Sequence, residues 1–140
     1  MTERTASCAC GRMTVTVPGE PAMVGSCHCD FCQRRTGSPF QVCAYYAPDA
    51  PIEIEGETTT YNGLETDGEA SASGNSVTYH FCSVCGSTVY WNIEGFLQAV
   101  AVGNFMDPDF PAPTRELNTR LRHHWVPPVP DAQQFDGEFG

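Results

Sequence analysis

The stretch that decides the fold is Cys27-His28-Cys29-Asp30-Phe31-Cys32, which reads CHCDFC. It holds three cysteines in six residues. Because this number is odd, a disulfide within the stretch would leave one cysteine unpaired. Between Cys29 and Cys32 a tight turn can bring both sulfurs to one ion, and between Cys27 and Cys29 an extended backbone places both side chains on one face. Three thiolates with a fourth position left open is the pattern of a catalytic zinc site.

Four further cysteines form two close pairs, Cys8/Cys10 and Cys82/Cys85, and a glycine after each pair frees the backbone for a turn. Together the pairs would complete a closed four-thiolate site of the structural kind. Spacing alone does not establish which groups share an ion, so the division into four and three is a hypothesis. The eighth cysteine, Cys43, lies in a strand-like run, where a small buried hydrophobe is the favoured interpretation.

The chain has 140 residues, enough for one hydrophobic core, and no repeat or linker divides it, so residues 1–140 are expected to form a single zinc-binding domain. A formal net charge of −10 argues against nucleic acid and anionic membranes as partners. The sequence shows no bilayer-spanning run and no secretory signal, so a cytoplasmic location is expected. In that reducing compartment cysteines favour metal ligation, and an exported disulfide framework is the less favoured alternative.

Short strand-like runs separated by Gly, Pro, Asn and Asp predict a mostly β fold. The expected strands are 13–17, 40–46, 52–55, 76–81, 88–91 and 96–102. Helical turns are expected near 30–36 and 114–122, and a surface loop at 65–75. The acidic, proline-rich tail at 127–140 is expected either to pack through Phe135 and Phe139 or to fray.

The fourth position beside the three-cysteine stretch has several candidate occupants: a water, a substrate sulfur, or the side chain of His28, His80 or Cys43. His28 should point away from its cysteine neighbours if the backbone is extended, which makes it a poor candidate ligand. A zinc ion with three thiolates carries a local charge of about −1 and is a weak Lewis acid. Such a site suits thiol chemistry better than metal-assisted hydrolysis.

The order of these motifs resembles the glutathione-dependent formaldehyde-activating enzyme family, which also includes centromere protein V-like members. The resembling stretches run from Cys8 to Val17, from Cys27 to Phe40 with its TGSPF segment, and from Phe81 to Tyr90. Residues 123–125 show a weaker similarity. The resemblance implies a mostly β fold of the zinc-stapled β-tent kind. It also implies carbon–sulfur bond chemistry, in which glutathione and formaldehyde give S-hydroxymethylglutathione.

The resemblance further implies two zinc ions, one structural and one at the active site. The structural ion would be held by Cys8, Cys10, Cys82 and Cys85, and the active-site ion by Cys27, Cys29 and Cys32. No set of glutathione contacts is evident beyond the metal. A site for an anionic tripeptide would have to draw on Arg34, Arg35, Arg115, Arg120 or Arg122.

Three functions stay open. The first is a zinc-dependent carbon–sulfur lyase or synthase, a monomer or homodimer, that adds a small aldehyde to a thiol such as glutathione or releases it. Arg34, Ser38 and His80 are its candidate substrate contacts, although ordinary solvated, turn and strand roles are commoner for such residues. The second is a non-catalytic, zinc-stabilised β-fold binding module. The third is a thiol redox or metal-buffering role.

Overall fold

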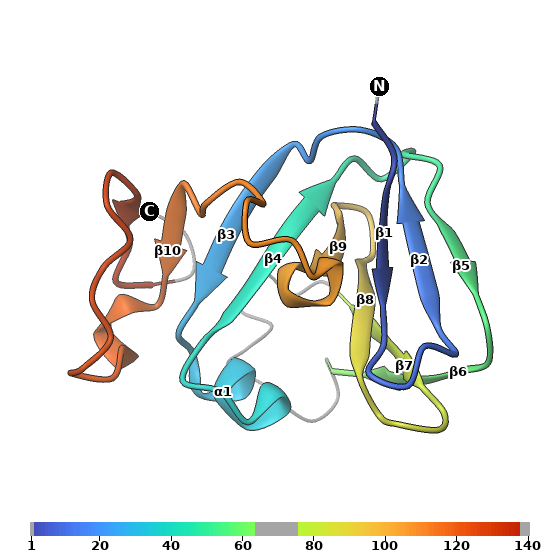
Figure 1. Cartoon of the computed structure of the whole chain (residues 1–140). Coiled ribbons are helices and arrows are strands. Elements are labelled where there is room, and N and C mark those ends of the chain that lie inside the picture. The colour runs from blue at the N-terminus through green and yellow to red at the C-terminus, as the bar shows by residue number, and fades with distance from the viewer. Residues whose placement is uncertain (1, 64–75, 138–140) are drawn as a thin grey trace.

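The structure is a computed structural model that describes residues 2–63 and 76–137 (Figure 1). The first strands are β1 (Arg4–Ser7), β2 (Thr14–Val17), β3 (Met23–Cys27), β4 (Gln41–Tyr46), β5 (Glu53–Glu55) and β6 (Thr58–Asn62). The later strands are β7 (Val77–Cys82), β8 (Thr88–Ile93), β9 (Gln98–Ala101), β10 (Arg115–Leu117) and β11 (Gln133–Gln134). The helical elements are α1 (Asp30–Thr36) and two 3₁₀ turns, η1 (Val102–Phe105) and η2 (Thr119–Leu121).

The strands form two sheets, which confirms the mostly β fold expected from the sequence. The smaller sheet is antiparallel with the order β1-β2-β5, and the larger has eight strands in the order β11-β10-β3-β4-β9-β8-β7-β6. Strands lie at all six expected places, and α1 occupies the expected helical turn at 30–36. The expected loop at 65–75 lies outside the described residues.

The expected helical turn at 114–122 is wrong over most of its length, because this segment is β10 followed by the short turn η2. Its first part pairs in parallel with β3, about ninety residues earlier in the chain, and no local pattern signals such a distant pairing. In the tail, the Arg115 guanidinium lies over the Phe135 ring, 5.6 Å from its centroid, so this part of the tail packs on the sheet. Phe139 lies outside the described residues.

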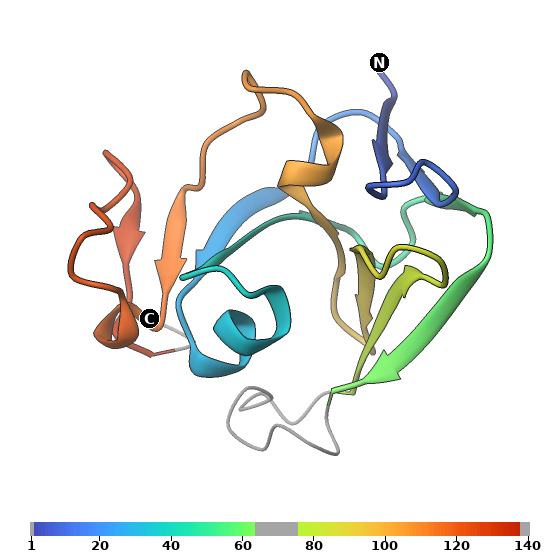
Figure 2. The same ribbon diagram turned by 60° about the horizontal axis from the view of Figure 1, so that its bottom comes forward.

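The two faces of the large sheet bury different cores, because neighbouring side chains along a strand point to opposite faces. One face packs against the small sheet through residues that include Val15, Val24, Ala44, Val89 and Val100. The opposite face packs against α1 through Phe31 and Cys32 of the helix and Cys43, Tyr79, Trp91 and Ala99 of the sheet. Figure 2 shows α1 lying inside the curve of the large sheet. The second cysteine stretch is therefore anchored on the face that carries the helix.

The helix α1 begins and ends at residues with specific backbone roles. Cys29 is its N-cap, and the Cys29 sulfur accepts a hydrogen bond from the backbone N–H of Cys32 at 3.3 Å. Gly37 ends the helix in the left-handed conformation at φ 71°, which glycine adopts without steric cost. The Cys-x-x-Cys spacing is thus built as a helix N-terminus, and the cap itself is a candidate metal ligand.

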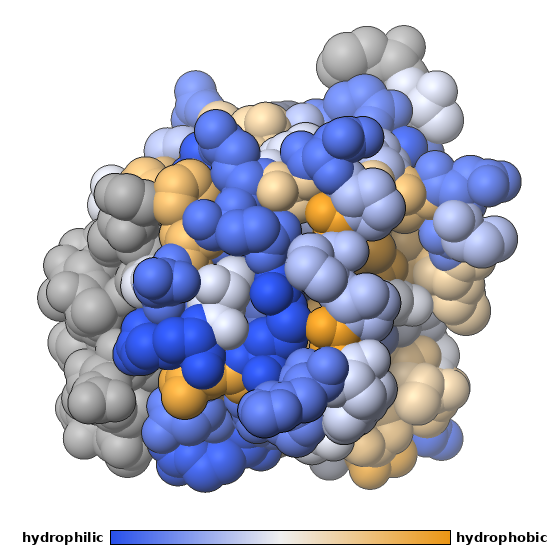
Figure 3. All heavy atoms as spheres, turned by 90° about the vertical axis from the view of Figure 1, so that its left-hand side faces the viewer, coloured by the Kyte–Doolittle hydropathy of each residue, from blue (hydrophilic) through white to orange (hydrophobic). Residues whose placement is uncertain are grey.

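The C-terminal segment returns to β3 and covers one edge of the large sheet. In the parallel pairing of β10 with β3, Glu116 lies opposite Ser26 and Leu117 lies opposite Cys27. Figure 3 shows this side of the molecule, where the surface is largely hydrophilic and hydrophobic residues appear only as small separate patches. The described residues contain no helix of the length and hydropathy that crossing a membrane requires.

Candidate metal centres

The four cysteines of the two close pairs come together in space. The sulfurs of Cys8, Cys10, Cys82 and Cys85 all lie within 4.8 Å of one another. The Cys10 sulfur lies 3.7 Å from that of Cys8 and 3.6 Å from that of Cys82. Four thiolates bound tetrahedrally at about 2.3 Å from one ion would have their sulfurs about 3.8 Å apart. These sulfurs therefore have the spacing that a single zinc ion requires.

None of the eight cysteines forms a disulfide. The sulfur separations in the four-cysteine cluster far exceed the disulfide bond length of about 2.05 Å. Backbone N–H groups point at two of the sulfurs, since Met13 donates to Cys8 at 3.2 Å and Cys85 donates to Cys82 at 3.5 Å. Hydrogen bonds from Ser87 lower the pKa of Cys85 to about 5. The cluster joins the β1–β2 turn to the β7–β8 turn.

The three cysteines of the CHCDFC stretch form a second cluster. Cys27 ends β3, Cys29 caps α1 and Cys32 lies in its first turn, and their sulfurs lie within 4.8 Å of one another. Hydrogen bonds from Cys29 and Cys32 lower the pKa of Cys27 to about 3. The same hydrogen bonds raise the pKa of Cys29 and Cys32, so without an ion the negative charge rests on Cys27. Three soft sulfur donors at this spacing suit a thiophilic cation such as zinc. Within residues 2–63 and 76–137, no fourth His, Cys, Asp or Glu completes the group.

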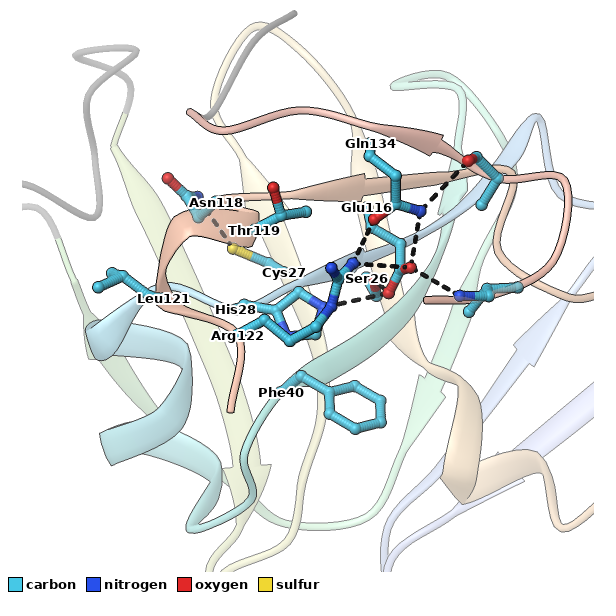
Figure 4. Close-up of polar contacts among 12 residues, drawn as sticks. Ser26, Cys27, His28, Phe40, Glu116, Asn118, Thr119, Leu121, Arg122 and Gln134 are labelled. Carbon is cyan, nitrogen blue, oxygen red and sulfur yellow. Dashed lines mark hydrogen bonds and ion pairs between the residues drawn. The ribbon is translucent and has the colours of Figure 1, made fainter. Parts of the chain in front are cut away.

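His28 lies between two of these cysteines, yet its side chain points away from them. The ring is fully buried, its Nε2 is 3.1 Å from Glu116 Oε1, and its centroid is 5.3 Å from that of Phe40 (Figure 4). The backbone of His28 is held as well, because its N–H donates to the Leu117 carbonyl and its own carbonyl accepts from Gln33 Nε2. His28 therefore fixes the segment that carries the sulfurs and does not join them.

Glu116 is the centre of a buried polar network behind the second cluster, on the other face of β3. The carboxylate is 1% exposed and accepts hydrogen bonds or ion-pair contacts from Ser26, His28, Arg122, Gln134 and the Val129 backbone N–H at 2.8–3.1 Å (Figure 4). Burial alone would raise the pKa of Glu116, but these hydrogen bonds outweigh burial and lower it to about 2. The network ties β3, β10 and the C-terminal segment together around a carboxylate that is charged at neutral pH.

Asn118 approaches the second cluster directly. Its Nδ2 donates to the Cys27 sulfur at 3.3 Å, while its Oδ1 accepts from Arg120 at 3.2 Å, which fixes the orientation of the amide. The residue follows β10 and has φ 56°, in the left-handed region that asparagine tolerates better than most residues. This turn brings the amide to the face of β3 where the sulfur lies. Sequence reasoning missed Asn118 and Glu116, because only the parallel pairing of β10 with β3 brings them to the site.

The other candidates from the sequence contact residues other than the three cysteines. Arg34 is exposed and 3.9 Å from Asp30. The Ser38 hydroxyl accepts from the Phe40 N–H at 3.5 Å within the turn after α1. His80 packs edge-on to Tyr90, with ring centroids 5.2 Å apart, and alternation along β7 places it on the opposite face of the sheet from Tyr79 and α1.

Cys43 is also buried outside both clusters. It is 1% exposed and lies in the core beneath α1. Burial raises the pKa of this thiol to about 12, so it stays protonated at neutral pH. Cys43 therefore contributes apolar volume to the core and joins neither group of sulfurs.

Comparisons with known proteins identify a family and a similar solved structure. The sequence profile of the family described as "Glutathione-dependent formaldehyde-activating enzyme" matches residues 3–121. No curated protein sequence matches the chain. The fold is similar to the crystal structure of a Rhodobacter sphaeroides protein, with a TM-score of 0.53 and 21% identity over 74% of this chain and 91% of that chain. At that identity the structural match shows the fold alone.

Proposed function

The chain belongs to the glutathione-dependent formaldehyde-activating enzyme family, and we propose that it joins a small thiol such as glutathione to a small aldehyde, or reverses that reaction. In the forward direction the thiol sulfur bonds to the carbonyl carbon, the C=O double bond becomes single, and the thiol proton ends on the oxygen. The observation that supports this proposal is the cluster of Cys27, Cys29 and Cys32, which has three sulfurs and no fourth ligand among the described side chains.

In this proposal each cysteine cluster holds one Zn²⁺. The cluster of Cys8, Cys10, Cys82 and Cys85 has four ligands and a structural role, since a closed set leaves no position for a substrate. The three-cysteine cluster leaves a position open. When bound there, zinc supplies a positive charge that favours the deprotonated, nucleophilic form of a thiol at neutral pH.

The residues around the three sulfurs have positioning roles in this proposal. The Asn118 amide and the Cys32 N–H fix the Cys27 and Cys29 sulfurs by hydrogen bonds, which also offset part of their negative charge. His28, held by Glu116, fixes the backbone between Cys27 and Cys29. A rigid set of ligands keeps its geometry while substrates enter and leave.

The test is turnover of glutathione and formaldehyde by the zinc-loaded full chain and by Cys29→Ser. We expect Cys29→Ser to lose activity by at least about 100-fold, with the four-cysteine site still loaded. Cys43→Ala is the matched control, because Cys43 is buried near the cluster without joining it, and it should keep wild-type activity. Undiminished turnover in Cys29→Ser would overturn the assignment of the site. A wild-type chain that carries two zinc ions but turns over no thiol and aldehyde would favour the non-catalytic binding module.

A further inference from the structure

The four-cysteine cluster lies at the surface of the molecule, where the β1–β2 turn meets the β7–β8 turn (Figure 1). Each turn contributes one buried and one exposed cysteine. Cys8 and Cys82 are 4% and 1% exposed and belong to the hydrophobic core, whereas Cys10 and Cys85 lie in exposed stretches of chain. The cluster therefore has an inner pair of cysteines in the core and an outer pair at the surface.

The surface beside both outer cysteines is open. Gly11 follows Cys10 and Gly86 follows Cys85, and apart from the chain neighbours no described atom lies within 4 Å of the place that a Cβ would take at either glycine. Val84, which precedes Cys85, is 58% exposed. A small molecule dissolved in water can therefore reach the outer part of this cluster.

The second cysteine cluster is more enclosed. Cys29 and Cys32 are 8% and 6% exposed and pack with Phe31 against the large sheet. Cys27 is half-buried, and its sulfur accepts a hydrogen bond from the Asn118 amide. Zinc holds its cysteine ligands as thiolates, so with an ion in each cluster both have the same reactive form of sulfur. Access then decides which sulfurs an oxidant reaches first.

A buried sulfur lies close to the exposed Cys10. The Cys10 sulfur is 3.6 Å from that of Cys82 in the other turn and 3.7 Å from that of Cys8 in its own turn. A disulfide to Cys8 would span one residue inside a tight turn, which leaves little freedom to reach disulfide geometry. A disulfide to Cys82 needs the two turns to approach by about 1.6 Å, from 3.6 Å to the bond length of about 2.05 Å. An exposed thiolate with a second cysteine in such reach is the arrangement of an oxidant-sensitive pair.

We propose that Cys10 is a site of oxidation by hydrogen peroxide and that Cys82 captures the product as a disulfide. The Cys10 thiolate attacks one peroxide oxygen and the O–O bond breaks, which gives a sulfenic acid on Cys10 and a hydroxide ion. The Cys82 thiolate then attacks the Cys10 sulfur, the S–S bond forms, and the S–O bond breaks to release a second hydroxide. Each thiolate loses one electron, and the peroxide takes up both.

The oxidised cluster loses its ion but keeps the link between the two turns. Only Cys8 and Cys85 remain as thiolates, which is too few for the four-ligand set of a structural zinc site. The new bond joins positions 72 residues apart, so it holds the β1–β2 turn to the β7–β8 turn in place of the metal. The second cluster keeps its ion, and oxidation therefore changes one of the two sites.

The test adds hydrogen peroxide to the zinc-loaded full chain with a chromogenic chelator present, and subtracts the release seen without peroxide. One ion per chain should be released at least about tenfold faster than the second. After free thiols are blocked, tandem mass spectrometry should find Cys10 bonded to Cys82. Cys29→Ser, which lacks the ion of the second cluster, should release its remaining ion at the wild-type rate. Loss of the fast release in Cys29→Ser would overturn the inference, because the fast ion would then come from the second cluster.

Two histidine variants separate the outer cysteines. Cys10→His keeps four possible ligands, because structural zinc sites include sets of three cysteines and one histidine, but it removes the sulfur that reacts. Peroxide-driven release should fall at least about tenfold in this variant. Cys85→His is the matched control at the other exposed position, and its release should stay within about twofold of wild type. Equal losses in both variants, or a wild-type disulfide that does not include Cys10, would overturn the inference, and the second result needs no variant to fold.

Melting measurements test whether the link survives. With all zinc removed from both samples, the peroxide-treated chain should melt at least about 5 °C above the reduced chain, because a disulfide that closes a long loop restricts the unfolded state. Dithiothreitol should reverse the oxidation and restore binding of the lost ion. Equal melting temperatures, or an oxidation that dithiothreitol does not reverse, would contradict a disulfide between the turns. None of these measurements depends on turnover, so their failure would leave the proposed reaction standing.

Discussion

The side-chain amide of Asn118 donates to the sulfur of Cys27 at 3.3 Å, across 91 residues of sequence. Arg120 holds the amide oxygen, so the N–H side faces the sulfur. A hydrogen bond from a neutral donor stabilises a thiolate ligand and restricts its orientation. This contact links the C-terminal segment to the second cysteine cluster.

Asn118→Ala should weaken zinc binding at the second cluster by about 10- to 100-fold, because the Cys27 thiolate loses its donor. Competition with a chromogenic chelator would measure the two sites in one titration, and the four-cysteine site serves as the internal control. Asn118→Gly separates the lost hydrogen bond from backbone strain, since glycine adopts φ 56° without cost. Wild-type affinity in both variants would show that the amide has no role in metal binding.

Glu116→Gln should destabilise the protein by about 2–4 kcal/mol at pH 7. The groups around both carboxylate oxygens are donors, so either orientation of the amide places an NH₂ group against an N–H or O–H. Urea unfolding of both zinc-loaded chains would measure the difference. A difference below about 0.5 kcal/mol would contradict the role given to this network.

The same pair of chains should show a definite pH dependence. The pKa of Glu116 is lowered to about 2 in the folded chain, below its unfolded value, so the charge stabilises the fold fully above about pH 5. That contribution is lost as the pH falls from about 5 toward 2. The stability difference between wild type and Glu116→Gln should therefore shrink over this range, whereas acid release of thiolate-bound metal affects both chains alike.

Metal content should follow the division of the cysteines. Elemental analysis should find two zinc ions per wild-type chain and per Cys43→Ala chain, and one in Cys29→Ser. Cys82→Ser should lower the melting temperature by about 10 °C or more, because the four-cysteine site joins two distant turns. Cys29→Ser should lower the melting temperature by less than Cys82→Ser does, since its cluster lies within one short segment. Loss of an ion in Cys43→Ala would contradict the four-and-three division.

Gly56→Ala should cost more than about 3 kcal/mol of folding stability. Gly56 has φ 98°, and a Cβ there would lie 1.9 Å from the Arg12 carbonyl oxygen, in the loop between the Cys8/Cys10 pair and β2. Gly95→Ala is the control, because Gly95 has φ 73° and no atom within 4 Å of the added Cβ, so it should cost only about 1–2 kcal/mol. Thermal unfolding of both variants would check whether the close approach, and not the positive φ alone, requires glycine at 56.

The predictable part of the fold was its local part. Alternating and β-branched runs placed strands such as β4 and β7, and a helical turn was expected where α1 lies. The strands β1, β3, β6, β10 and β11 were missed. Of these, β10 is held as a strand by pairing with β3, and Arg115–Leu117 carries little intrinsic preference for that conformation. A short polar strand on a distant partner leaves no local signal.

The candidate site, like the fold, has a part that was predictable from the sequence and a part that was not. Cysteine order and spacing determined which sulfurs could group, because a turn or a strand fixes the relative directions of nearby side chains. The partners of those sulfurs were not predictable: Asn118 reaches Cys27 only through a parallel strand pairing and a positive φ, and Glu116 meets His28 only through the same pairing. The sequence also offered five arginines for an anionic substrate, and the structure places Arg35 over the rings of Tyr79 and Trp91 and Arg34 beside Asp30.

By itself, then, the amino-acid sequence determined the mostly β class, the family and the grouping of the cysteines, since all three depend on short-range order along the chain. Only the tertiary structure decided which side chains surround the second cluster. Those contacts join residues up to about ninety positions apart, and they depend on strand register, where a shift of one residue would turn each side chain to the other face.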